Sequence, residues 1–293
     1  MFKRVLIANR GEIANRIIST CLDLGIETVA IYSDEDRSLH YLNRADNAYR
    51  VGPGPVSLSY KNKDAIIAIA KMAEVDCIHA GYGFLSEDAD FAKMCKDNNI
   101  EFIGSNYDVL KKAENKLNMR ALSRKLGIKT VQCSEEPVKD MASAKKIAKE
   151  MGYPVMLKPV SGSHARGIRR VESEDAIDKA FVATKIEAGV TQADDSLLME
   201  KVVLNAKHIE VSVLRDKGGR ILTLPELDCS IQRRYLKIVA ETPAPGIDDK
   251  TRKIIKDAAA KLAEGINLVG LASFEFLVNK DGVFFLEVNP RLT

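Results

Sequence analysis

Short apolar runs alternate with segments of helical spacing through the first part of the chain. Val5–Ala8 is the first such run, and Ile13, Ile17 and Ile18 follow it at intervals of three or four residues. The pattern predicts strands at 5–8, 27–32, around 77 and at 101–103, and helices at 13–22, 64–72, 89–95 and 107–126. Strands and helices that alternate through short turns are typical of a parallel sheet with helices on both faces.

Two polar turns follow these expected strands, at the edge where open α/β sheets usually place ligands. Asn9–Glu12 has one glycine and no G-x-G-x-x-G pattern, so a plain connecting turn is favoured over a dinucleotide site. His79–Glu87 follows the third expected strand and carries two glycines. It favours either a close backbone approach to a ligand or a tight turn in which Ser86 caps the next helix.

A hairpin with a loop of small residues is expected in the middle of the chain. Strands at 153–158 and 168–171 flank the loop 159–167. Lys158 at the mouth of this loop and Arg166 inside it favour a loop that folds over phosphate groups. A plain hairpin loop is the alternative.

The next expected strand, 197–203, is apolar except for Glu200 and Lys201. An isolated charged pair in such a strand lies either on a solvated edge or in a largely apolar pocket. The second arrangement is typical of adenine sites, which combine flat apolar contacts with one or two hydrogen bonds.

Two aromatic-rich strands near the end of the chain, 272–279 and 283–289, are expected to pair through a three-residue loop at 280–282. In that register Glu275 lies opposite Glu287. The other expected cross-strand pairs are Leu277 with Phe285 and Asn279 with Val283. The face expected to be buried holds Phe274, Phe276, Val278, Phe284, Leu286 and Val288.

Two carboxylates directly opposite each other repel unless a cation lies between them. With Asn289 they offer only oxygen donors, which favour a hard cation such as phosphate-bound Mg²⁺. The alternative is an exposed face whose charges ignore each other, but the apolar Leu277 and Phe285 expected on that face argue against full exposure. We therefore favour a metal site at Glu275, Glu287 and Asn289.

A cluster of cations, Arg233, Arg234 and Lys237, follows a further expected strand at 208–213. Such clusters are commonly solvated surface. Close to magnesium-binding carboxylates, however, cations would suit anionic substrates and the charge that develops during phosphoryl transfer. The helix expected at 248–264 has one apolar face and is interpreted as a core helix.

Composition excludes several classes of protein. The chain has 293 residues, of which 46% are hydrophobic and 29% charged, enough for about two domains. A formal net charge of +3 argues against a nucleic-acid binder, and no apolar run approaches the ~18 residues of a membrane helix. Five scattered cysteines without a Cys-x-x-Cys pair, and a start without a signal peptide, favour a cytoplasmic protein.

Several segments together resemble the biotin carboxylase component of the biotin-dependent carboxylases. They occur in the family's order and are Ile7–Ala14, Gly81–Glu87, Asp228–Arg234, Phe274–Phe276 and Glu287–Arg291. The resemblance runs along essentially the whole chain, so chance is not a serious explanation.

The resemblance implies an ATP-grasp fold, of mixed α/β and α+β class, in three parts. A parallel α/β domain is expected at 1–113 and a β-rich lid at 131–203. The C-terminal ATP-grasp domain is expected at 114–130 and 204–293. We expect this domain to be incomplete.

The implied activity uses ATP and Mg²⁺ or Mn²⁺ to convert bicarbonate into carboxyphosphate, which then carboxylates biotin. The implied partners are bicarbonate, ATP, the biotin carboxyl carrier protein that bears the biotin, and a carboxyltransferase. A homodimer that lacks part of its usual surface is the implied assembly.

The resemblance also implies a role for individual residues. Those implied for ATP are Lys116, Lys158, Ser161, Gly162, Arg166, Gly167, Glu200, Val203, His208, Gln232 and Leu277. Those implied for the metal are Glu275, Glu287 and Asn289, in agreement with the hairpin argument. Lys237 and Arg291 would contact bicarbonate or its phosphorylated product.

Two departures from the family pattern lower the expected activity. Ser161, Ser163, His164 and Ala165 stand where the family's lid loop has glycines, and side chains there obstruct close backbone approach to phosphate. The sequence stops at Thr293, and the family's base for bicarbonate follows shortly after the equivalent point. We therefore expect an N-terminal portion of a biotin carboxylase that binds Mg-ATP weakly and does not turn over alone.

Two further hypotheses are compatible with the sequence. One is a non-catalytic nucleotide-binding or assembly module, or one half of a split carboxylase. The other is a different ATP-grasp ligase that joins a carboxylate to an amine or thiol. The segments Gly81–Glu87 and Gln232–Arg234 weigh against this second hypothesis.

Overall fold

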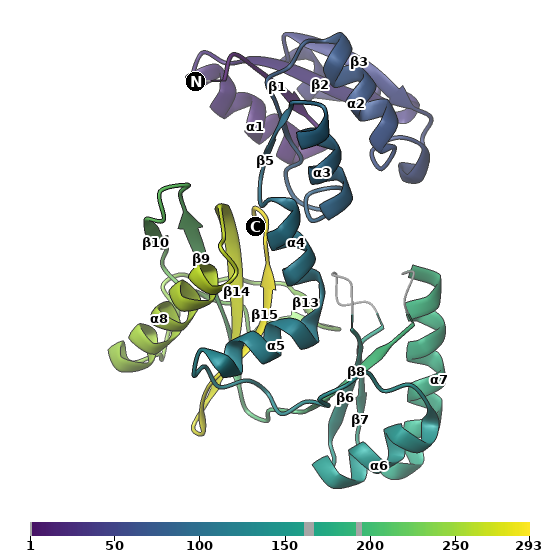
Figure 1. Ribbon diagram of the computed structural model, residues 1–293, viewed down its shortest axis with the longest axis vertical. Helices are drawn as coiled ribbons and strands as arrows, with labels where there is room; N and C mark the ends of the chain where they lie inside the picture. The colour runs from purple at the N-terminus through teal and green to yellow at the C-terminus, as the bar shows by residue number, and fades with distance from the viewer. Residues whose placement is uncertain (1, 161–166, 192–194) are drawn as a thin grey trace.

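The computed structural model describes residues 2–160, 167–191 and 195–293, which form three larger sheets with helices packed against them (Figure 1) and one two-stranded hairpin. Each of the three larger sheets has a hydrophobic core of its own. No helix in the described ranges is long and apolar enough to cross a membrane.

The N-terminal sheet is parallel throughout and has the strand order β3-β2-β1-β4-β5. Its elements are β1 (Arg4–Ile7), α1 (Gly11–Asp23), β2 (Glu27–Ser33), η1 (Asp34–Asp36), η2 (His40–Asn43), β3 (Asn47–Gly52), η3 (Val56–Leu58), α2 (Lys63–Met72), β4 (Cys77–His79), α3 (Ala89–Asp97) and β5 (Glu101–Ile103). Along β1, Val5 and Ile7 pack on the α1 side, whereas Leu6 packs on the side of α2 and α3. The predicted parallel sheet covered on both faces is therefore confirmed.

One strand of this sheet, β3, was not expected from the sequence. It is an edge strand, and its first four residues are exposed or half-buried. Without a buried face there is no strong apolar alternation along 47–52, which explains why the hydrophobic pattern missed it. His79–Glu87 consequently follows the fourth strand of the chain rather than the third.

The helix expected over 107–126 is two helices, α4 (Tyr107–Glu114) and α5 (Lys116–Lys125). Asn115 between them has an extended backbone, and its side chain caps α5 by accepting the Asn118 N–H at 3.1 Å. The break makes Lys116 the first residue of α5.

The middle of the chain forms an antiparallel sheet of order β7-β6-β8, covered by two helices (Figure 1). The elements are α6 (Met141–Met151), β6 (Val155–Pro159), β7 (Arg169–Val171), α7 (Glu174–Thr191) and β8 (Leu197–Lys201). Val155 and Leu157 alternate into the core beneath the helices. Met156 and Lys158 therefore point away from that core.

The C-terminal sheet has the antiparallel order β10-β9-β14-β15, with β11 also paired to β9. Its elements are β9 (Lys207–Arg215), β10 (Ile221–Thr223), β11 (Leu227–Asp228), α8 (Asp249–Gly265), β14 (Gly270–Asn279) and β15 (Gly282–Asn289). Helix α8 packs its apolar face on the sheet, as expected. A separate small hairpin pairs β12 (Gln232–Arg233) with β13 (Leu236–Lys237).

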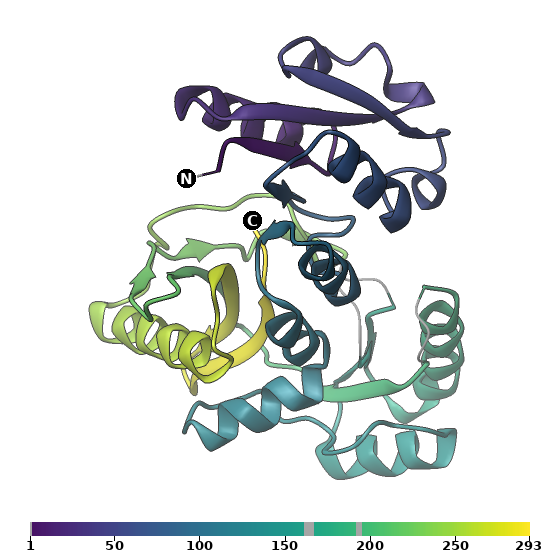
Figure 2. The same ribbon diagram turned by 45° about the horizontal axis from the view of Figure 1, so that its top comes forward.

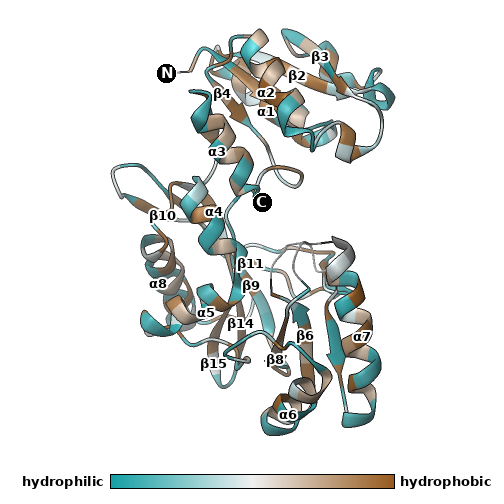
Figure 3. Cartoon of the chain, turned by 45° about the vertical axis from the view of Figure 1, so that its right-hand side comes forward, coloured by the Kyte–Doolittle hydropathy of each residue, from teal (hydrophilic) through white to brown (hydrophobic). Residues whose placement is uncertain are grey.

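The hydropathy of the strands and the position of the C-terminal residues agree with this arrangement of sheets. The strands of the N-terminal sheet are largely hydrophobic in Figure 3, as expected for strands buried on both faces. Beyond β15 the chain turns toward the N-terminal layer (Figure 2), and Leu292 packs against the core beneath α1.

The β14–β15 hairpin confirms one expected pairing and corrects two others. Glu275 lies opposite Glu287 as predicted. The loop is one residue shorter than expected, because Asn279 pairs with Gly282 and Leu277 with Phe284. A β-bulge at Leu286 adds one residue to β15 and restores the expected register beyond it.

The bulge also changes which face each aromatic residue occupies. Phe285 and not Phe284 is fully buried, with its ring 5.9 Å from that of Phe276. Leu286, expected in the core, instead lines a cavity beside Glu287. A single inserted residue reverses the side-chain alternation, which explains why the predicted faces of residues 284–286 were wrong.

Candidate functional site

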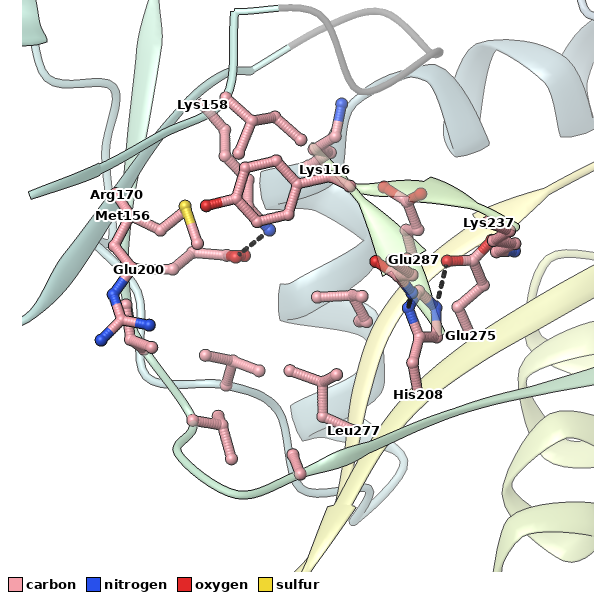
Figure 4. A pocket seen from close by; sticks show the side chains of 18 of the residues that line it. Lys116, Met156, Lys158, Arg170, Glu200, His208, Lys237, Glu275, Leu277 and Glu287 are labelled. Carbon is pink, nitrogen blue, oxygen red and sulfur yellow. Dashed lines mark hydrogen bonds and ion pairs between the residues drawn. The ribbon is translucent and has the colours of Figure 1, made fainter. Parts of the chain in front are cut away.

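A cavity of about 480 Å³ lies between the β6–β8 sheet and the C-terminal sheet (Figure 4). Figure 4 shows Lys158 and Glu200 on one wall and a charged group on the opposite wall: His208, Lys237, Glu275 and Glu287. The apolar Leu277 lies between the two walls. The space therefore has a charged group at each side and an apolar centre.

Twelve of the predicted site residues line this cavity. They are Lys116, Lys158, Glu200, Val203, His208, Gln232, Lys237, Glu275, Leu277, Glu287, Asn289 and Arg291. Gly167 lies apart from them, in a neighbouring opening that Gln232 also lines. Ser161, Gly162 and Arg166 lie outside the described residues. The structure brings most of the candidates together, and their individual roles remain predictions.

Three carboxylates lie side by side across β9, β14 and β15, because Glu275 pairs with Glu210 on one side and Glu287 on the other. Lys237 contacts the first two, with its Nζ 2.6 Å from Glu275 Oε1 and in contact with Glu210. Burial would lower the pKa of Lys237, but the two carboxylates outweigh it and raise the pKa. One ammonium group thus serves two of the three carboxylates.

Glu275 is the most heavily hydrogen-bonded of the three. His208 Nε2 lies 2.6 Å from Oε2, and Asn289 Nδ2 donates to Oε1 at 2.9 Å. Burial would raise the pKa of Glu275, but the contacts with His208 and Lys237 outweigh it and lower the pKa to about 2. Gln232 Nε2 lies 2.6 Å from His208 Nδ1 and holds the imidazole in this position.

The carboxylate of Glu287 has fewer favourable contacts than that of Glu275. Burial and the neighbouring charge of Glu275 raise the pKa of Glu287. Within residues 2–160, 167–191 and 195–293 its carboxylate forms no hydrogen bond or ion pair. A buried carboxylate beside a second one is costly unless a cation approaches it.

The donor set around Glu287 fits a hard divalent cation. Glu275, Glu287 and Asn289 all line the cavity, and their carboxylate and amide oxygens are the ligands that such a cation prefers. The described chain holds no group of three or more His, Cys, Asp or Glu side chains suited to a metal. Two carboxylates suffice for Mg²⁺ bound through phosphates, which usually takes only one or two from the protein.

A second charged group forms the opposite wall. Glu200 faces Met156 across the β6–β8 pair, so Lys158 lies diagonal to it on the same face. Lys158 Nζ is 2.5 Å from Glu200 Oε2, and Arg120 NH2 is 2.5 Å from Oε1. Burial would raise the pKa of Glu200, but Arg120 and Lys158 outweigh it and lower the pKa to about 2.

Sequence reasoning missed Arg120 and Glu210. Arg120 lies four residues after Lys116, hence on the same face of α5, and this spacing was the only signal for it. Glu210 lies two residues after His208 on β9, and side chains two residues apart on a strand point to the same face. This spacing was the signal for Glu210. Of the predicted basic cluster, only Lys237 reaches the carboxylates: Arg233 is exposed and Arg234 lines the neighbouring opening.

Arg291 and Lys116 complete the charged surroundings of the cavity. Arg291 Nε lies 3.4 Å from Glu87 Oε1, which links the cavity to the turn after β4. Burial lowers the pKa of Lys116, although the charge of Glu287 opposes this. Both cations are thus close to carboxylates in the present arrangement.

Two family models match the chain and together cover nearly all of it. Residues 1–110 match the model described as biotin carboxylase, N-terminal domain. Residues 115–293 match the model described as carbamoyl-phosphate synthase L chain, ATP binding domain.

Curated proteins and solved structures agree with these models. The chain is 44% identical over its whole length to biotin carboxylase 2 of Bacillus subtilis and spans 66% of that protein. A biotin carboxylase–β-γ-ATP complex from Campylobacter jejuni superposes with a TM-score of 0.97 at 40% identity, covering 100% of this chain and 66% of that one.

A third match contains nucleotide, metal and bicarbonate. It is the biotin carboxylase domain dimer of the Hydrogenobacter thermophilus 2-oxoglutarate carboxylase, in complex with MgADP, ADP and bicarbonate. The TM-score is 0.96 at 38% identity, with 100% of this chain and 65% of that chain covered. The chain thus spans slightly less than two thirds of these relatives.

Proposed function

Because the chain belongs to the biotin carboxylase family, and has its ATP-grasp fold, we propose that its cavity binds ATP together with Mg²⁺ or Mn²⁺. We propose further that the protein acts in the activation of bicarbonate to carboxyphosphate and the carboxylation of carrier-bound biotin. The observation that carries the proposal is the pair Glu275–Glu287, which faces Lys158 across an apolar-centred cavity.

The base of the nucleotide would occupy the apolar part of the cavity. Leu277, Met156 and Val203 line this part and offer flat contacts. Backbone groups of residues 200–203 would supply the hydrogen bonds that recognise the adenine edge. His208 and Gln232, which contact each other, would lie near the ribose and phosphates.

The phosphates would lie between the two charged walls, near Lys116 and Lys158. Gly167, with a positive φ of 71°, is the last residue of the predicted lid loop and can bring backbone close to a phosphate. Glu275, Glu287 and Asn289 would hold the divalent cation. When bound, the cation neutralises phosphate charge during transfer.

Lys237 and Arg291 would bind bicarbonate and its phosphorylated product. Glu210 and Glu275 hold the Lys237 ammonium at the cavity, and Glu87 contacts Arg291 from the N-terminal layer. Cations fixed in this way can stabilise charge that develops on a transferring phosphoryl group without reorganising first. We propose a biotin carrier protein and a carboxyltransferase as partners, and a homodimer that lacks part of its usual surface as the assembly.

The three-part division at 1–113, 131–203 and 114–130 with 204–293 remains part of this proposal. Impaired turnover of these 293 residues alone also remains an expectation. Release of ADP that depends on bicarbonate and free biotin, and that is lost in Glu275→Gln, would contradict that expectation.

The test uses Mn²⁺ as a paramagnetic substitute for Mg²⁺. We expect the water-proton relaxation caused by Mn-ATP to be enhanced when the protein is added, because bound Mn²⁺ tumbles slowly, and Glu287→Gln to remove this enhancement. Glu264→Gln, at an exposed position on α8, serves as the charge-matched control and should behave like the unchanged protein. Identical enhancement for both variants would contradict the proposed metal site.

A further inference from the structure

Arg120 is the largest fully buried side chain in the described part of the molecule, with 1% of its surface exposed. It reaches from α5 into the space between the two sheets that form the cavity. NH1 donates to the carbonyl oxygen of Phe285 on β15, and the guanidinium lies 5.6 Å from the centre of the Phe285 ring. NH2 donates to Glu200 Oε1 on β8. Arg120 thus joins both walls from behind the cavity.

Glu200 has one cation on each carboxylate oxygen. Arg120 and Glu200 are almost completely buried, at 1% and 2% side-chain exposure, whereas Lys158 is 12% exposed and lines the cavity. The three side chains together carry a single positive charge. Only Lys158 presents that charge to the cavity.

Removing Arg120 would change this balance. Among the described residues, Lys158 would then be the one remaining ion-pair partner of Glu200, and this pair would be retained because a buried carboxylate without a partner is strongly disfavoured. The remaining pair would have no net charge. Lys158 could then approach a phosphate only by leaving Glu200 buried and unpaired.

We propose that Arg120 is a positioning residue of the nucleotide site, which neutralises Glu200 from behind so that Lys158 can be shared with the phosphates. This inference rests on the proposed function, since it requires a nucleotide in the cavity. Arg120 itself touches no nucleotide and acts through Glu200 and Lys158. It is therefore expected to affect ligands with phosphates more than ligands without them.

Isothermal titration with Mg-ATP and with adenosine separates this role from a purely structural one. We expect Arg120→Met to weaken ATP binding about tenfold or more and adenosine binding less than about threefold. Arg120→Lys keeps the charge and should retain most of the ATP preference. Arg124→Met, at an exposed position one turn along the same helix, is the matched control and should leave both affinities unchanged.

A double variant tests the proposed route directly. In Arg120→Met with Glu200→Gln, the carboxylate that would hold Lys158 is gone, so the preference for ATP over adenosine should largely return. Equal losses of ATP and adenosine in Arg120→Met, or no recovery in the double variant, would overturn the inference. Circular dichroism identifies any unfolded variant. If Arg120→Met does not fold, the affinities of Arg120→Lys and of the double variant for ATP and adenosine test the inference instead.

The titrations also distinguish failure of the inference from failure of the proposed function. If the unchanged protein binds neither ligand, the proposed nucleotide site is wrong and the inference falls with it. If the unchanged protein binds ATP but Arg120→Met keeps its preference for ATP over adenosine, only the inference is overturned.

Discussion

Lys237 Nζ lies 2.6 Å from Glu275 Oε1, so a residue proposed for bicarbonate directly contacts a residue proposed for the metal. Glu210 contacts the same ammonium from the next strand. The proposed bicarbonate and metal residues are therefore joined by one partly buried ion-pair network. Any change at Lys237 should alter the carboxylates as well.

Replacing Lys237 by Gln should destabilise the fold by about 2 kcal/mol, because two buried carboxylates lose their shared cation. The figure is below that for a fully buried pair because 32% of the Lys237 side chain is exposed. Glu210→Gln added to Lys237→Gln should recover part of the loss. Urea unfolding of the single and double variants measures this coupling, and strictly additive effects would contradict the network.

Glu287→Gln should have opposite effects on stability and on ligand response. It removes the repulsion between the half-buried Glu287 and the buried Glu275, so the free protein should become more stable by about 1 kcal/mol. It also removes a proposed metal ligand, so Mg-ATP should no longer raise the melting temperature. Thermal unfolding with and without Mg-ATP tests both effects. A destabilised variant that still responds to Mg-ATP would be inconsistent with this account.

Stability should fall in mild acid because of His79. Burial lowers the pKa of His79 to about 4, and Nδ1 accepts the Gly81 N–H at 2.9 Å. The unfolded chain binds a proton at His79 below about pH 6.5, while the folded chain does so only near pH 4. His79 should therefore remove up to about 3 kcal/mol of stability as the pH falls between these values.

Urea unfolding at several pH values between 7.5 and 4.5 measures this loss. His79→Gln should flatten the pH dependence in that range, whereas the exposed His40→Gln should leave it unchanged. Equal pH dependence in the unchanged protein and His79→Gln would show that His79 is not responsible.

Leu277→Trp should fill the apolar centre of the cavity and block the base of the nucleotide. Leu277 lines the cavity and is only half-buried, so a larger side chain can point into the open space. We expect at least about a tenfold loss of adenosine affinity, with little change in urea stability. Unchanged adenosine binding would place the base elsewhere.

Much of the fold followed from the sequence because hydrophobic periodicity reports burial. The parallel layer, the β6–β7 hairpin and the pairing of Glu275 with Glu287 were all predicted correctly. β3 was missed because its edge position leaves little buried surface. The predicted register near residue 285 was wrong because neither the shorter loop nor the bulge at Leu286 can be recognised in the pattern of apolar residues.

The candidate site could be predicted only where the interacting residues are close together in the sequence. The pairing of two carboxylates within one hairpin could be derived from the strands themselves. The ion pair of Lys237 with Glu210 and the contact of Arg120 with Glu200 join elements far apart in sequence, across 27 and 80 positions. Spacing along the chain carries no information on such contacts, which depend on how the sheets pack.

The central claim is that the cavity binds ATP through a divalent cation held by Glu275 and Glu287. Isothermal titration of the 293-residue chain with ATP, in the presence and absence of Mg²⁺, tests it most directly. We predict one weak site per chain that requires Mg²⁺ and is lost in Glu287→Gln. No heat of binding in either condition, or equal binding without Mg²⁺, would contradict the account.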